Sequence, residues 1–170
     1  MIKISLPRIL ALLSMALGTW LALQWLAFPS WVGQPPLWLQ ANLQTSLMLA
    51  MMGLALFLRA SSERSTLAHR AASAIALAGA VFAAVVLLQS LLGLESGFDL
   101  PRPRDTPSYF TPHPGRMSPN SCLAFMAAGA ALWWAHPARS KRYAQAHGGA
   151  LVLLVAITSV ALIGHLIGLE

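Results

Sequence analysis

Five long apolar runs constrain the architecture of this chain, at residues 9–28, 43–58, 71–94, 117–135 and 149–169. A helix of about 20 apolar residues can cross the hydrocarbon core of a bilayer. Charged residues make up only 9% of the sequence, far below the roughly 25% of an ordinary soluble domain. We therefore expect an all-α membrane protein with about five transmembrane helices, of which the second is the shortest.

A sequence repeat relates the last four apolar runs to one another. The heptapeptide QSLLGLE at residues 89–95 returns as GHLIGLE at residues 164–170, 75 residues later. Residues 45–47 (TSL) correspond to residues 121–123 (SCL) at an offset of 76, which also pairs Gly53 with Gly129. Such a period indicates repeated structural units. We predict an N-terminal anchor helix and outer loop at 1–41, a helical hairpin at 42–95, a Pro-rich external loop at 96–116 and a second hairpin at 117–170.

Basic residues mark every second connection between the apolar runs. They are Lys3 and Arg8, then Arg59, Arg64 and Arg70, then Arg139, Lys141 and Arg142. Loops rich in lysine and arginine stay on the cytoplasmic side of a membrane, so the N-terminus is expected in the cytoplasm and the C-terminus of this chain in the periplasm. The net charge of +6 is not gathered into a surface that could follow a phosphate backbone, so no nucleic-acid partner is expected.

Polar residues are rare within the apolar runs. The candidates for intramembrane polar function are Gln24, Gln89, Thr158, Ser159 and His165. A polar group in hydrocarbon is costly unless it has a partner, and a hydrogen bond to a neighbouring helix or loop is the simplest role for each. The apolar runs contain no acidic residue, which argues against an ion-driven transporter.

The sequence offers no cofactor or catalytic motif. His113 and His165 could both lie at the outer membrane level, where two imidazoles could ligate haem iron or a metal. No C-x-x-C-H or H-E-x-x-H pattern fixes such a geometry, and no phosphate loop or nucleophile elbow is present. We expect no cofactor, no metal and no enzymatic activity in this chain. A transporter or a haem-binding membrane protein is the least favoured alternative.

Residues 113–125 (HPGRMSPNSCLAF), followed by small and apolar residues to Leu132, resemble the G-R-M-[SA]-P-N-T-A-L-x-F motif of membrane input regions in bacterial signalling proteins. Those regions precede diguanylate cyclase (GGDEF), EAL, PAS or histidine-kinase modules. The likeness extends over residues 40–170, with Ser121 where threonine is commoner. Within the motif, Ser118 followed by Pro119 predicts an N-cap and the start of the fourth helix.

The resemblance implies a sensory or anchoring region in the bacterial inner membrane. Its output module, a diguanylate cyclase or the histidine kinase of a two-component system, is expected after a sixth span in a longer polypeptide. The implied partners are the lipid bilayer and a homodimer or downstream signalling module. The expected contacts of the outer loop are His113, Arg116 and Asn120, with Glu95 and Asp99. A small stand-alone membrane subunit or scaffold is the alternative.

Overall fold

The computed structural model describes residues 5–27, 42–61, 65–95, 99, 115–135 and 141–166. These residues form five α-helices and no strand, as the apolar runs predict. The helices are α1 (Leu6–Ala27), α2 (Leu43–Ser61), α3 (Thr66–Leu92), α4 (Pro119–Trp134) and α5 (Lys141–Leu166).

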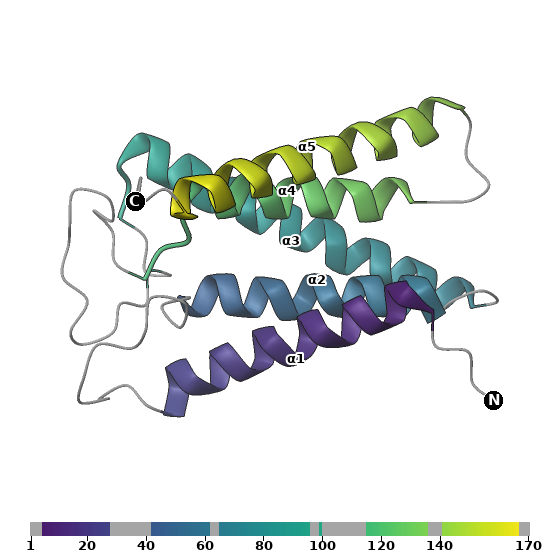
Figure 1. Ribbon diagram of the computed structural model, residues 1–170, viewed down its shortest axis with the longest axis horizontal. Helices are drawn as coiled ribbons and strands as arrows, with labels where there is room; N and C mark the ends of the chain where they lie inside the picture. The colour runs from purple at the N-terminus through teal and green to yellow at the C-terminus, as the bar shows by residue number, and fades with distance from the viewer. Residues whose placement is uncertain are drawn as a thin grey trace.

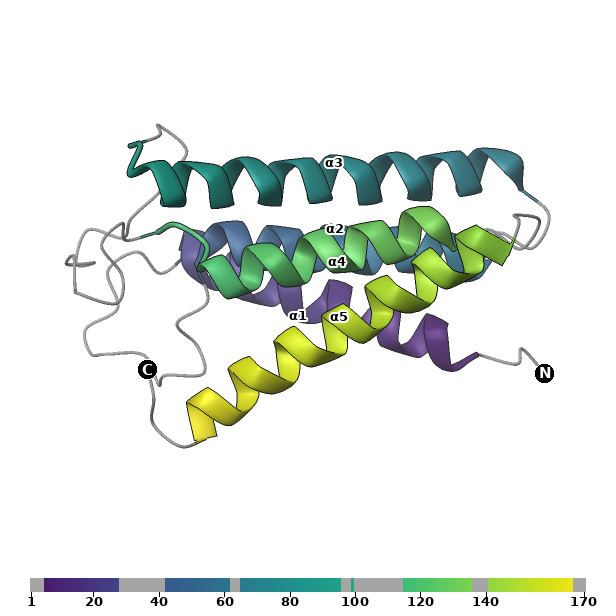
Figure 2. The same ribbon diagram turned by 90° about the horizontal axis from the view of Figure 1, so that it is seen from above.

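Helices α2 and α4 lie at the centre of the bundle. Figure 2 shows α3 on one side of this pair and α1 and α5 on the other. Helix α3 packs on both central helices, α1 packs on α2, and α5 packs on α4. The chain therefore runs back and forth between two ends, and α1 begins at the end opposite to that where α5 finishes (Figure 1).

Four helices are long and apolar enough to cross a membrane, namely α1, α2, α3 and α5. Helix α2, with 19 residues, is the shortest of these four, as expected of the second span, whereas α4, with 16 residues, is not among them, so four of the five expected spans are supported. At 1.5 Å per residue α4 is about 24 Å long, less than the ~30 Å of a hydrocarbon core. Ser118 and Pro119 fix its start, and Trp134 is its last residue.

Small residues let the helix backbones approach closely. A Cβ atom on Gly18 would lie 2.5 Å from the backbone nitrogen of Ala50, and one on Gly129 would lie 2.6 Å from the carbonyl oxygen of Ala76. Gly53 and Gly79 are similarly enclosed, by α1 and by methionines of α2. Packing by small residues, the usual device of membrane helices, therefore holds this bundle together.

The two glycines matched by the sequence repeat occupy comparable places. Gly53 of α2 lies against the backbone of α1, and Gly129 of α4 lies against the backbone of α3. In both central helices the matched glycine thus contacts the helix that precedes it in the chain. This correspondence relates α1 and α2 to α3 and α4, whereas the predicted hairpins join α2 with α3 and α4 with α5. The repeated hairpin therefore stays a prediction.

Candidate functional site at the Arg116 end

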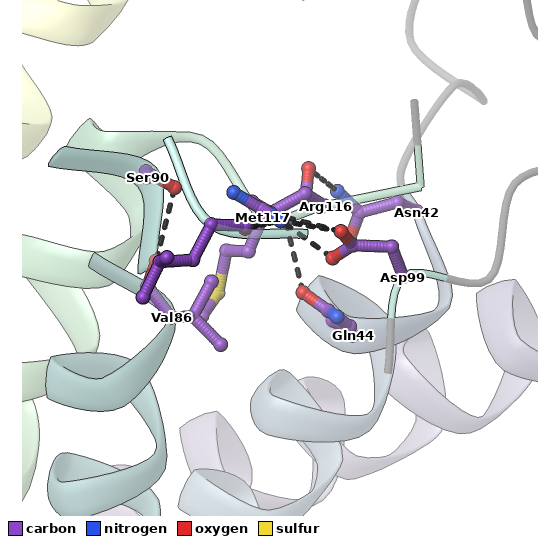
Figure 3. Close-up of polar contacts among 8 residues, drawn as sticks. Asn42, Gln44, Val86, Ser90, Asp99, Arg116 and Met117 are labelled. Carbon is purple, nitrogen blue, oxygen red and sulfur yellow. Dashed lines mark hydrogen bonds and ion pairs between the residues drawn. The ribbon is translucent and has the colours of Figure 1, made fainter. Parts of the chain in front are cut away.

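Three helix ends meet at one end of the bundle, which we call the Arg116 end. They are the start of α2, the end of α3 and the start of α4, with the short segment of residues 115–118 leading into α4. Figure 3 shows Asn42, Gln44 and Asp99 on one side of this segment and Val86 and Ser90 of α3 on the other. We refer to Asn42, Gln44, Leu94, Asp99, Arg116 and Met117 as the Arg116 cluster.

A buried ion pair forms the centre of the cluster. The side chain of Arg116 is only 3% exposed and that of Asp99 is 15% exposed. The Arg116 Nε donates to Oδ1 and Oδ2 of Asp99 at 3.0 and 3.2 Å, and Nη2 donates to Oδ2 at 2.5 Å. Nη2 also donates to the carbonyl oxygen of Leu94 at 2.7 Å. This forked arrangement is the strong form of arginine–carboxylate contact, and it joins the end of α3 to the segment before α4.

The backbone of the same segment is held by α2. Asn42 Nδ2 donates to the carbonyl oxygen of Arg116 at 2.7 Å, and the Met117 amide donates to Gln44 Oε1 at 2.9 Å. Asn42 also caps α2, because its Oδ1 accepts from the Thr45 amide at 2.8 Å. The Asn42 side chain therefore caps α2 and also holds the segment that leads into α4.

Local sequence explains why the segment folds this way. Gly115 has a φ of +82°, which glycine adopts without a steric cost. The Ser118 side chain accepts from the Ser121 amide at 3.2 Å and caps α4, with Pro119 at its first position. These contacts confirm the predicted helix start. Met117 is 1% exposed and packs with Cys122 in the apolar core.

The predicted outer-loop residues separate into two groups. Asp99 and Arg116 meet in the ion pair, whereas Glu95 and Asn120 are exposed. His113 lies outside the described residues. The sequence reasoning missed Asn42 and Gln44. Asn42 could have been found, because an asparagine directly before an apolar run is an N-cap signature.

Among the predicted intramembrane polar residues whose side chains the structure describes, no hydrogen bond joins one to another. Thr158 donates to the carbonyl oxygens of Leu154 and Val155 at 2.8 and 3.1 Å, within its own helix. Ser159 is exposed, and Gln24 is partly exposed on α1. Gln89 lines a groove on α3. The side chain of His165 lies outside the described part.

The opposite end of the bundle, which we call the Arg59 end, carries a second polar layer. Arg59 Nη2 donates to the Leu132 carbonyl oxygen at 2.6 Å, and Nη1 donates to Ser73 Oγ at 3.3 Å. Arg8 Nε donates to the Ala60 carbonyl oxygen at 3.1 Å, and His147 Nδ1 is 2.9 Å from the carbonyl oxygen of Ala131.

These side chains satisfy carbonyls in the last turns of α2 and α4, where a positive charge also complements the helix dipole. This end also holds the arginines that the sequence predicts on one side of the membrane, namely Arg8, Arg59, Arg70 and Arg142. The 16 steps of α2 from Leu43 to Arg59 separate the two polar layers by about 24 Å.

The contacts at the Arg116 end are an ion pair and hydrogen bonds. Among the described residues, no group of three histidine, cysteine, aspartate or glutamate side chains is arranged to hold a metal ion. The Arg116 Nη1 is buried and has no hydrogen-bond partner within the same part of the chain. The site can therefore hold a carboxylate and tie three helix ends together.

Comparison with family models, curated proteins and solved structures gives no match. The fold itself defines the class of the protein. It is an all-helical bundle with four apolar helices suited to membrane insertion, and its charged contacts are concentrated at the two ends.

Proposed function

We propose that this chain is the membrane-embedded sensory or anchoring region of a bacterial signalling protein. The observation that carries the proposal is the buried ion pair of Arg116 with Asp99, formed by the arginine of the Gly-Arg-Met-Ser-Pro-Asn motif. In that motif the glycine turns the backbone, the methionine fills the core and the serine caps α4. A motif whose residues have such defined roles suits a fixed junction between an external connection and the bundle.

The ion pair supplies a bistable element for signalling. With the pair formed, Leu94 and Asp99 after α3 are held to the segment that starts α4, and Asn42 holds the same segment to α2. With the pair broken, Asp99 is released from the segment that starts α4, while α3 keeps its packing on α2 and α4. A stimulus that binds one of these two states better shifts the population between them. The residues that would transmit the stimulus are therefore Asp99 and Arg116.

The proposed orientation follows from the charges of the two ends. Arginines gather at the Arg59 end, which the positive-inside rule assigns to the cytoplasm. The Arg116 end then faces the periplasm of a bacterial inner membrane. The output is exerted by a cytoplasmic histidine kinase or diguanylate cyclase, carried on the same polypeptide or on a partner, and the region works as a homodimer or with that downstream module.

The test replaces Asp99 in the native host. Asp99→Asn keeps the size of the side chain and removes its charge, and Glu95→Gln removes a charge from an exposed residue nearby. At equal membrane levels, Asp99→Asn should change cyclic di-GMP or kinase phosphorylation at least several-fold, while Glu95→Gln should leave both at wild-type values. Cross-linking should capture the cyclase or kinase module.

Unchanged outputs in the Asp99→Asn strain would overturn the sensory role. Cross-linking to a complex without any signalling module would favour the stand-alone subunit or scaffold instead.

A further inference from the structure

The net charge of the chain is concentrated in the segments that flank the Arg59 end. Counted along the sequence, the N-terminal segment, the connections from α2 to α3 and from α4 to α5, and the helix turns beside them contain one acidic residue, Glu63. The same segments contain the basic residues Lys3, Arg8, Arg59, Arg64, Arg70, Arg139, Lys141 and Arg142. Eight positive charges against one negative charge leave +7 in these segments, more than the +6 of the whole chain.

The arginines at this end have two different roles. Arg8 and Arg59 are half-buried and donate to backbone carbonyls in the last turns of α2 and α4. Arg70 of α3 and Arg142 of α5 are exposed, and within the described part of the chain no hydrogen bond or ion pair engages either side chain. These two guanidinium groups can therefore contact a partner outside the bundle.

Arg70 and Arg142 lie at helix starts, where a positive charge is unfavourable. Helix α3 begins at Thr66 and α5 at Lys141, both at the same end of the bundle (Figure 1), and neither helix has an acidic residue in its first turn. Helical side chains lean toward the N-terminus, so Arg70 in the second turn lies over the first. The start of a helix carries a positive partial charge that favours an anion. An anionic partner would therefore offset both the arginine charges and the helix dipoles.

Apolar neighbours of these arginines indicate which kind of anion fits. Leu67 is 77% exposed and lies one turn before Arg70 on α3, and Leu6 is 67% exposed at the start of α1. A soluble anion would leave these leucines in water. The boundary between lipid head groups and hydrocarbon accommodates both the leucines and the arginines. Arg142 lies two residues before the membrane-length part of α5, Ala144–Ile163, which places it at such a boundary.

We propose that the Arg59 end binds the head groups of anionic phospholipids through Arg70 and Arg142. In a zwitterionic phospholipid a positive group accompanies the phosphate, so a lipid with a net negative charge is preferred. One arginine near an anionic membrane surface contributes ~1 kcal/mol, which is about fivefold in affinity. The proposal does not depend on the signalling role, because it rests on the charge and exposure of this end alone.

Native mass spectrometry of the full chain in mild detergent tests the proposal, by titration with phosphatidylglycerol or with phosphatidylcholine of the same acyl chains. Wild-type protein should bind phosphatidylglycerol more tightly by about fivefold or more. Arg70→Gln combined with Arg142→Gln should lower the affinity for phosphatidylglycerol by about the same factor and leave that for phosphatidylcholine unchanged. The two corresponding changes to lysine keep the charge and should preserve the preference.

The matched control combines Arg102→Gln with Arg104→Gln, which removes the same charge from the connection between α3 and α4. This control should keep the wild-type preference for phosphatidylglycerol, because its substitutions lie outside the segments that flank the Arg59 end. Circular dichroism checks that each variant retains its helix content. If the Arg70 and Arg142 double variant does not fold, Arg142→Gln alone replaces it, with a loss of affinity in the same direction.

Three results would overturn the proposal. The first is equal affinity of wild-type protein for the two lipids. The second is an equal loss in the control and in the variant that lacks Arg70 and Arg142, which would make the preference a matter of net charge and not of this end. The third is displacement of phosphatidylglycerol by an excess of inorganic phosphate, which would identify a soluble anion as the ligand.

Discussion

Replacing Asp99 by asparagine is the sharpest test of the Arg116 end. The change leaves the Arg116 side chain, which is 3% exposed, as a buried cation without a counterion. Removing one partner of a buried ion pair costs about 3–5 kcal/mol. Since Asp99 is 15% exposed, water can partly replace the carboxylate, and we expect a loss near the lower limit, about 3 kcal/mol.

The assay is reversible unfolding by sodium dodecyl sulfate in mixed micelles, followed by circular dichroism. A double-mutant cycle with Arg116→Gln isolates the pair itself. The double variant should be more stable than Asp99→Asn alone, because it has no unpaired buried charge. Glu95→Gln, at an exposed position, should change the free energy of unfolding by less than about 0.5 kcal/mol.

Two outcomes would refute this reasoning about the ion pair. The free energy of unfolding of Asp99→Asn could lie within about 0.5 kcal/mol of the wild-type value, which is the range of an ordinary surface substitution. The double variant could instead lose the sum of the two single losses, which would mean that Asp99 and Arg116 do not interact.

Three further predictions concern packing, capping and orientation. Gly129→Val should lower the free energy of unfolding by about 1–3 kcal/mol in the same assay, because its Cβ would press on the Ala76 carbonyl. Gly149→Ala, where an added Cβ has no atom within 4 Å, should instead stabilise α5 by about 0.5–1 kcal/mol. Equal effects of the two substitutions would contradict the described packing of Gly129. Ser118→Ala should cost about 1 kcal/mol through the lost N-cap, and no loss in the melting curve would exclude that role. In intact cells a membrane-impermeant maleimide should label Glu95→Cys but not Arg142→Cys, and the reverse pattern would invert the orientation.

The helices could be predicted because an apolar run of membrane length is a local property of the sequence. Their ends were less well predicted. Helix α5 begins at Lys141 and α3 at Thr66, eight and five residues before the apolar runs that start at 149 and 71. Polar residues such as lysine, arginine and glutamine form helices well. Hydropathy therefore marks the apolar part of a helix and misses the polar turns that extend beyond it.

The contacts of the candidate site needed the structure. Asp99 and Arg116 were both expected in the outer region, but they are 17 positions apart and nothing in the sequence indicates that they pair. Asn42 and Gln44 meet residues that are 74 and 73 positions away. Apart from Ser73 Oγ, the acceptors described at the Arg59 end are backbone carbonyls, which have no sequence signature. Only the spacing of the helices brings these groups together.

The unequal lengths of the helices have a mechanical consequence for the surrounding membrane. Helices α2 and α4 are short rods beside the much longer α3 and α5, and Figure 2 shows α5 inclined to α4. At 1.5 Å per residue α2 is about 28 Å long, close to the ~30 Å of a hydrocarbon core, so the mismatch falls on α4, where thinning of the bilayer costs a fraction of a kcal/mol per ångström. The lipid composition therefore changes the free-energy cost of this mismatch, and shorter acyl chains reduce it.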